Sequence, residues 1–203
     1  MVDEYQVGMG FGAAYESKTR HGYPLDEVIS ALQKSIRRGM TDEAMFWAVE
    51  LNESGYGAYA FRRMMVIASE DIGPADDNAI VVVMALYQAC EVMRAASKGT
   101  TEQKRGRPWN EESILHAVAY LARAPKSRVM ADAYSTIKVR LEKRQLLEIP
   151  DVAIDQHTAR GKRLGRGEGH FQSEGRVVAH AAATDLDRWL EAWQAERPKA
   201  RDE

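Results

Sequence analysis

The sequence lacks most of the residues from which metal, disulfide and nucleotide sites are built. Its 203 residues include a single cysteine, Cys90, which excludes an intramolecular disulfide and any zinc site made of cysteines. The five histidines are scattered, and none has a spacing typical of metal ligands. No G-x-x-x-x-G-K-[ST] phosphate-binding loop occurs, because the one Gly-Lys pair, Gly161-Lys162, is followed by Arg163. We therefore expect neither a metal nor a cofactor.

An excess of charge of one sign is also lacking. The chain has 28 lysines and arginines against 30 aspartates and glutamates, so its formal net charge is −2. Affinity for nucleic acid would therefore have to come from a local basic patch. The longest apolar run, residues 79–87, is far shorter than the ~20 residues of a membrane span, and the N-terminus has no apolar signal region. We expect a cytoplasmic protein without a membrane segment.

Apolar residues recur at helical spacing through the middle of the chain, and no useful strand alternation occurs. Leu25, Val28, Ile29, Leu32 and Ile36 follow the 3.6-residue period of a helix. The pattern predicts an all-α fold with helices over residues 25–38, 42–53, 58–71, 76–97, 110–123 and 128–147.

Two polar residues stand where a helix N-cap is expected. Thr41 precedes the second predicted helix, and Ser127 precedes the sixth. The fourth predicted helix, residues 76–97, is the most apolar, and its length without glycine or proline favours a central buried helix over a strand.

Glycine is concentrated outside the helical region, and this divides the chain into four parts. We predict an N-terminal arm over residues 1–24 and a helical domain over residues 25–150. A basic, glycine-rich segment covers residues 151–179, and a C-terminal amphipathic helix with a tail covers residues 180–203.

Three residues at the end of the third predicted helix invite a catalytic interpretation. Ser69, Glu70 and Asp71 include two adjacent carboxylates, but adjacent residues on a helix point ~100° apart, so the pair cannot serve as acid and base without other groups. A structural role, in which the carboxylates bind backbone N–H groups or a nearby arginine, is favoured over a catalytic or metal-binding one. Cys90 is interpreted as a core thiol.

Several segments, taken in order, resemble a known family. They are residues 29–37, 42–47, 68–73, 87–91, 119–122 leading into 124–127, and His157 with 161–169. Together they resemble the C-terminal region of the replication-associated recombination protein A family, the RarA/MgsA ATPases and their Werner-helicase-interacting relatives. The resemblance covers roughly residues 25–169. The residues that we assign to its structural motifs are Ser69, Glu70, Asp71, Gly73, Pro125, Lys126 and Ser127.

The resemblance implies a compact helical domain like the C-terminal collar of clamp loaders. In that family this region assembles the subunits into a homotetramer, and the proteins bind DNA and interact with single-stranded-DNA-binding protein. The resemblance does not extend to the AAA+ ATPase core, so we expect no enzymatic activity. The family's aromatic, proline-containing tail also differs from the helix that we predict over residues 180–197.

The glycine-rich segment holds the best candidate for contact with DNA phosphates. Arg160, Lys162, Arg163 and Arg166 cluster there, and the glycines between them leave backbone N–H groups able to approach an anion. The alternative is an ordered loop with solvated charges. A second basic cluster, Lys98, Lys104, Arg105 and Arg107 beside Trp109, allows the same two interpretations.

The predicted C-terminal helix carries an apolar stripe. Leu186, Trp189, Leu190 and Trp193 fall at i, i+3, i+4 and i+7. Trp189, Leu190 and Trp193 either fold back on the helical domain or lie at a subunit or partner interface, where tryptophan is enriched.

Three functions follow from these features. The first is a non-catalytic assembly module that forms a homo-oligomer, expected to be a tetramer, in association with DNA. The alternative is an adaptor or inhibitor that docks on a separate AAA+ ATPase or replication protein. The third is an enzyme using Ser69, Glu70, Asp71 and a histidine, which would need a pocket with converging polar groups.

Overall fold

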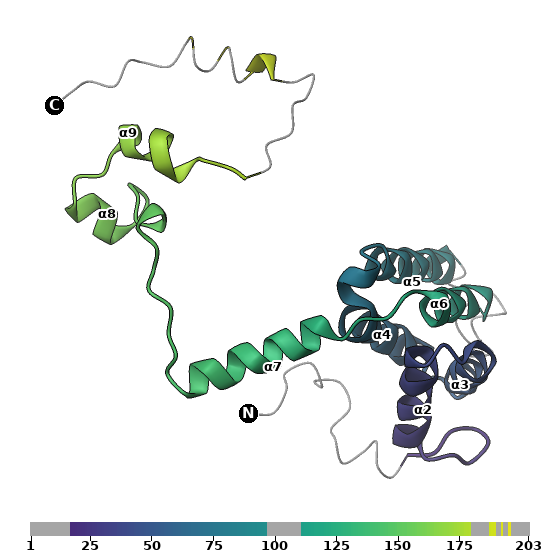
Figure 1. The fold of residues 1–203 in the computed structure, drawn as a ribbon. Coiled ribbons are helices and arrows are strands. Elements are labelled where there is room, and N and C mark those ends of the chain that lie inside the picture. Colours follow the sequence, from purple (N-terminus) through teal and green to yellow (C-terminus); the bar gives the residue numbers. More distant parts are fainter. Residues whose placement is uncertain (1–16, 97–110, 180–186, 190–191, 193–194, 196–203) are drawn as a thin grey trace. The chain divides into compact units, whose positions relative to one another are not determined.

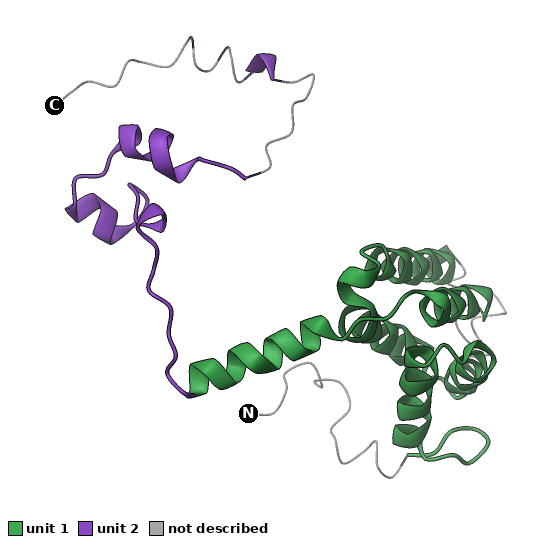
Figure 2. Cartoon of the chain, viewed as in Figure 1, with its two compact units in different colours: residues 1–142 green, residues 143–203 purple. Residues whose placement is uncertain are grey.

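The computed structural model describes residues 17–96, 111–179, 187–189, 192 and 195, and every described element is helical. The chain divides into two compact units, residues 1–142 and 143–203 (Figure 2). The first unit contains α2 (Leu25–Arg37), α3 (Thr41–Glu53), α4 (Gly57–Ile67), α5 (Ala79–Ala96), α6 (Glu111–Arg123) and α7 (Val129–Glu142) (Figure 1). The predicted all-α class is confirmed.

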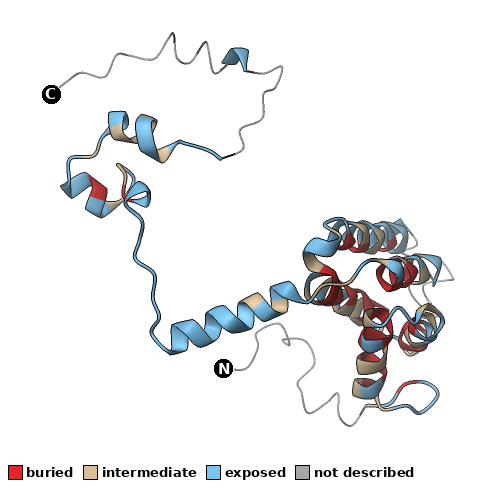
Figure 3. Ribbon diagram, in the orientation of Figure 1, coloured by how far each residue is buried: buried red, intermediate tan, exposed pale blue. Residues whose placement is uncertain are grey.

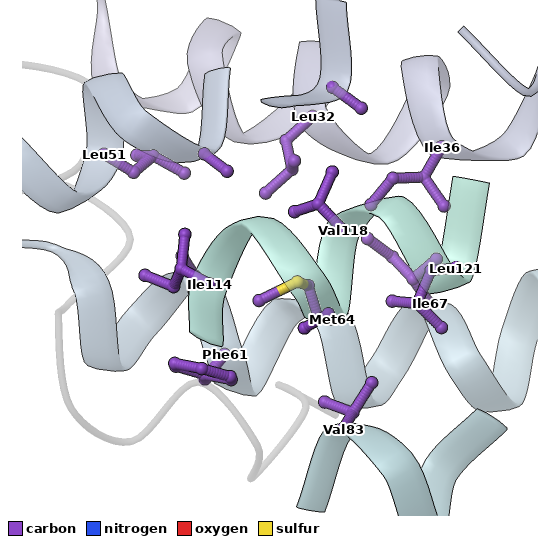
Figure 4. Packing of buried hydrophobic residues seen from close by; sticks show 14 of the residues in the cluster. Leu32, Ile36, Leu51, Phe61, Met64, Ile67, Val83, Ile114, Val118 and Leu121 are labelled. Carbon is purple, nitrogen blue, oxygen red and sulfur yellow. The ribbon is translucent and has the colours of Figure 1, made fainter. Parts of the chain in front are cut away.

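The core of the first unit lies among α2, α3, α4 and α6. α3 packs against both α2 and α6, and the apolar face predicted for α2 is buried along its whole length. Figure 4 shows side chains of these helices and of α5 meeting in one cluster, whose labelled members are Leu32, Ile36, Leu51, Phe61, Met64, Ile67, Val83, Ile114, Val118 and Leu121. At about 1.5–3 kcal/mol for each large apolar side chain removed from water, this cluster is the main source of stability for the unit.

The third predicted helix differs from the observed one at its C-terminal end. The expected helix 58–71 is α-helical only to Ile67 and continues as a π-helical turn, η2 (Ala68–Ile72), followed by the 3-10 turn η3 (Gly73–Ala75). Gly73 has a φ of +48°, a left-handed conformation that glycine adopts without strain, and this ends the helical run. π-Helical turns are rare and occur frequently at functional sites.

Three other sequence predictions about helix ends need correction. Thr41 is not an N-cap, because α3 already begins there and Met40 occupies the cap position without a side-chain hydrogen bond. The sixth helix is shorter than predicted, since α7 ends at Glu142, and Arg144 two residues later has a φ of +54°. Ser127 is not the N-cap either, because α7 begins at Val129 and Arg128 occupies the cap position; the Ser127 hydroxyl accepts a hydrogen bond from the Val129 N–H, at 3.3 Å, in the turn before the helix.

The prediction that the fourth helix is central and buried is wrong. α5 buries only Ala79, Val83 and Cys90, and Val81 and Val92 are exposed. α5 packs on α4, η2 and α6, so its apolar content exceeds the surface that these neighbours cover. Among the described residues, α5 also has the length and apolar composition that a membrane-crossing helix needs. Core helices of water-soluble proteins share these properties, so the match is weak evidence for a membrane span.

The second unit consists of short helical turns joined by loops. They are η5 (Asp151–Ala153), α8 (Ala159–Arg163), α9 (Glu168–His170) and the π-helical turn η6 (Phe171–Gly175). Among the described residues of this unit Ile154 is the buried apolar one, and the rings of His157 and Phe171 meet edge to face with centroids 5.1 Å apart. Polar contacts therefore connect most of the described part of this unit.

Candidate functional site

A buried carboxylate lies at the centre of a charged cluster in the π-helical turn η2. The Asp71 side chain is fully buried. It accepts hydrogen bonds from Arg37 Nε at 2.6 Å, from Arg128 Nη1 at 2.9 Å and from Gln33 Nε2 at 3.0 Å. Its backbone carbonyl accepts a further bond from the Ser127 N–H at 2.9 Å. Asp71 thus joins α2, η2 and the turn before α7.

The neighbouring Glu70 shares the same two arginines at the edge of this cluster. Its carboxylate lies 3.0 Å from Arg128 Nη1 and 3.4 Å from Arg37 Nη2. The hydrogen bond to Glu70 is the main reason that the pKa of Arg128 is raised, so the guanidinium stays charged. The Ser69 hydroxyl donates to the Met65 carbonyl of the preceding helix α4, at 3.4 Å. Both carboxylates are thus paired with arginine, one of the contacts that the structural interpretation expects.

Sequence reasoning identified the carboxylates of this cluster but not their partners. Arg37, Gln33 and Arg128 lie 34, 38 and 57 residues from Asp71, and no local pattern connects them. Arginine keeps its charge throughout the physiological pH range, so the two carboxylates are paired with permanent cations. We call this cluster the ionic brace.

The turn over Pro125, Lys126 and Ser127 is fixed by backbone contacts on both sides. The Lys126 ammonium donates to the carbonyl oxygens of Leu121 and Ala122, both at 2.9 Å, and also to that of Ala124. It caps the C-terminal end of α6, where the helix dipole favours a cation. Partial burial lowers the pKa of Lys126, and the carboxylate of Asp71 opposes this shift.

Three of the four predicted DNA-contacting residues are exposed on one short helix. Arg160, Lys162 and Arg163 lie on α8 and have exposed side chains. Arg160 and Arg163 are one turn apart, and Lys162 points to another side of the short helix. We call these three cations together the α8 basic face. Figure 3 shows this exposure in the second unit, with a buried position between the cations. That position is Gly161.

Gly161 has a different role from the one predicted. Its N–H is not free for an anion, because it donates to the Thr158 hydroxyl at 2.9 Å. A Cβ at this position would lie 1.8 Å from the Asp155 carbonyl oxygen, so only glycine fits. The glycine allows the Asp155 loop to pack against α8. Its backbone N–H is used in a hydrogen bond within the segment.

Arg166, the fourth predicted contact, is directed inward. Its Nη2 atom lies 2.7 and 2.8 Å from the two carboxylate oxygens of Asp151. Its Nη1 atom donates to the carbonyls of Ile154, at 2.6 Å, and Asp151, at 3.0 Å. The hydrogen bond from Arg166 holds the pKa of Asp151 below its usual value. Arg166 closes the loop that leads into α8, and of the four predicted contacts the other three are exposed.

A second polar contact stabilises the same loop. His157 Nδ1 lies 2.9 Å from the Asp155 carboxylate, which also accepts from the His157 N–H. The His157 side chain is the first cause of the lowered pKa of Asp155. The residues of the segment that sequence reasoning missed, Asp151, Asp155 and Thr158, therefore set the geometry of the α8 basic face.

The remaining predicted site residues are only partly described. Trp189 is exposed, and the Arg188 guanidinium carbon lies 5.8 Å from its ring centroid. Leu190 and Trp193 lie outside the described residues, as does the basic cluster over residues 98–109. Within the described part of the chain, no group of three His, Cys, Asp or Glu residues could hold a metal ion.

The described residues form only helices, as expected of the helical C-terminal region of an AAA+ ATPase. Residues 39–185 match the family described as MgsA AAA+ ATPase C terminal, and the chain belongs to this family. The resemblance predicted from the sequence is thereby confirmed.

Curated relatives carry matching names. The chain is 32% identical to the replication-associated recombination protein A of Haemophilus influenzae over 77% of its own length and 32% of that protein. It is 30% identical to the protein of the same name from Escherichia coli K12, over 84% of the chain and 35% of that protein. It is 35% identical to the ATPase WRNIP1 of Dictyostelium discoideum, over 61% of the chain and 13% of that protein. The chain thus spans about a third of the length of the bacterial relatives.

Proposed function

We propose that this protein is a non-catalytic assembly module of replication and recombination that forms a homo-oligomer, expected to be a tetramer, and contacts DNA. Membership of a family whose relatives are named for replication-associated recombination supports the process. The α8 basic face is the observation that carries the DNA contact, because three exposed cations are presented by a turn that Gly161 and Arg166 hold in one conformation. We place the protein in the cytoplasm.

Phosphate contacts make binding salt-dependent, and this gives the test. Replacing Arg160, Lys162 and Arg163 together with alanine removes up to three phosphate contacts, so the slope of log affinity against log salt should fall by about 2–3 on duplex DNA. The measurement is fluorescence anisotropy of labelled duplex and single-stranded DNA across a salt series. Arg166 is left intact because its loss would disturb the loop.

A matched control removes the same charge from the first unit. Lys34, Arg38 and Arg62 are exposed there, and their triple alanine variant changes the net charge equally. The proposal requires that only the α8 variant lose affinity. No binding by the wild-type chain at low salt, or an equal loss in both variants, would contradict a DNA contact at the α8 basic face.

A second candidate function is docking on a separate AAA+ ATPase or on a replication protein such as single-stranded-DNA-binding protein. The exposed apolar residues of α5, including Val81, Met84 and Val92, favour it, because apolar patches of this kind often mark interaction sites. A photo-crosslinking residue at Val92 should capture the purified ATPase or binding protein in this case. Self-crosslinking alone would exclude it.

A further inference from the structure

Helix α7 is attached to the first unit mainly at its first turn. It packs on η2 and η3, and the described part of the first unit buries none of its side chains. A Cβ on Gly73 would lie 3.3 Å from Met130 Cγ, so the close packing is at the start of the helix. Burial of an apolar face is what usually fixes a helix in place. The direction of α7 within its unit therefore depends on the polar contacts at its start.

Those polar contacts belong to the ionic brace. Arg128, the residue before α7, donates from a single nitrogen, Nη1, to Asp71 Oδ1 at 2.9 Å and to Glu70 Oε1 at 3.0 Å. The Ser127 N–H donates to the Asp71 carbonyl at 2.9 Å. We call the two side-chain contacts of Arg128 the Arg128 latch. They connect the first turn of α7 to the π-helical turn η2.

The other side of the ionic brace comes from α2 and is the stronger one. Arg37 binds Asp71 with two nitrogens, Nε to Oδ1 at 2.6 Å and Nη2 to Oδ2 at 3.3 Å. Gln33 donates to Oδ2 at 3.0 Å. Arginine contacts that use two nitrogens are the stronger and more specific kind. The buried carboxylate of Asp71 therefore keeps a cation and a hydrogen bond on each oxygen when Arg128 moves away.

We propose that the Arg128 latch is a conformational switch, which holds α7 in one direction when closed and lets the intact helix swing when open, while the core stays folded. The pivot lies at residues 127–129. Lys126 stays attached to the end of α6, because its ammonium donates to the Leu121 and Ala122 carbonyls at 2.9 Å. The chain leaves the first unit through α7, so the latch sets the direction in which it leaves.

The exposure of the latch makes it reversible. The side chains of Arg128 and Glu70 are 42% and 32% exposed, so water and salt reach the ion pair. Ion pairs of this kind are weak and are screened by salt, whereas the buried side of the brace is screened much less. Raising the salt concentration from about 0.1 M to about 1 M shortens the screening length from about 10 Å to about 3 Å. High salt should therefore open the latch before it affects the core.

The test measures the direction of α7 by double electron–electron resonance. Nitroxide labels are attached to the full chain at Glu43→Cys on α3 and Lys138→Cys on α7, both of which are exposed positions. The wild type is the labelling blank, because its single cysteine, Cys90, is buried. Lys138 lies about 15 Å along the helix from Arg128, so a swing of about 30° moves its label by about 8 Å.

Arg128→Gln should broaden the distance distribution by about this amount, because the variant loses the charge that holds α7. Arg123→Gln is the matched control, since it removes one charge close to the same turn from an exposed residue that donates to the Ala119 carbonyl. It should leave the distribution narrow. Arg128→Lys keeps the charge and should restore a narrow distribution at low salt. Arg37→Gln should lower the urea midpoint more than Arg128→Gln does.

Salt and helicity complete the test. The wild-type distribution should broaden toward that of Arg128→Gln as salt rises, and the variant itself should not respond. Circular dichroism should show that Arg128→Gln retains its helicity. A broad wild-type distribution at low salt, equal distributions in Arg128→Gln and the wild type, or broadening accompanied by loss of helicity would each overturn the switch.

Discussion

Replacing Asp71 with asparagine tests whether the buried carboxylate braces the helical unit. Asparagine keeps the shape of the side chain but removes its charge, and its amide can turn donors toward the guanidinium groups. The contacts at stake are those to Arg37 at 2.6 Å, Arg128 at 2.9 Å and Gln33 at 3.0 Å. The variant therefore leaves Arg37 and Arg128 without the buried carboxylate that neutralises their charges.

The exposure of the arginines determines the size of the loss. Removing one partner of a buried ion pair costs about 3–5 kcal/mol when the other charge stays buried. The side chains of Arg37 and Arg128 are 32% and 42% exposed, so water can partly solvate them. We therefore expect a loss of about 2–3 kcal/mol in the free energy of unfolding. For a unit of this size the melting temperature should fall by about 6–12 °C.

Thermal and urea unfolding followed by circular dichroism measure this effect. Glu70→Gln is the matched control, because Glu70 contacts the same arginines at 3.0 and 3.4 Å but is itself partly exposed. It should cost less than about 1 kcal/mol, as partly exposed ion pairs do. Equal losses in the two variants would refute the assignment of the brace to Asp71.

Three further predictions concern other parts of the chain. Gly161→Ala should open the second unit to proteolysis, because its Cβ would meet the Asp155 carbonyl at 1.8 Å, whereas Gly169→Ala, with open space around it, should not. Leu121→Ala should lower the free energy of unfolding by about 2–5 kcal/mol in urea titrations, since Leu121 is fully buried. Burial raises the pKa of Glu50, but hydrogen bonds from Thr19 and His21 outweigh this and leave it lowered. The stability that Glu50 contributes should therefore be present at neutral pH and be lost as the pH falls below 4.5, and Glu50→Gln should remove that part of the pH dependence.

Local periodicity was sufficient to predict where most helices lie. The spacing of Leu25, Val28 and Leu32 places these residues on one face of a helix, and the structure buries that face of α2. The burial of α5 could not be predicted in this way, since an apolar composition does not say how many neighbours cover a helix. Val92 is an example, because it is apolar but exposed.

The functional residues were harder to predict because their roles depend on distant partners. Arg166 belongs to a basic cluster in the sequence, yet Asp151, 15 residues earlier, turns its guanidinium inward. The glycine at position 161 signalled backbone freedom, and the structure uses that freedom for contact with Asp155. Sequence patterns show which residues carry charge or flexibility, while the folded chain decides which of them remain accessible.

The brace around Asp71 also bears on the order of folding. It joins residues that are 34 and 57 positions apart in the sequence, so two long loops must close before it can form. Closing loops of these lengths costs about 3–4 kcal/mol each in chain entropy. We expect the brace to form after the folding transition state, and substitutions in it to speed unfolding while leaving the folding rate almost unchanged. The lifetime of the folded unit, measured in stopped-flow unfolding, would then depend on this cluster more than its small size suggests.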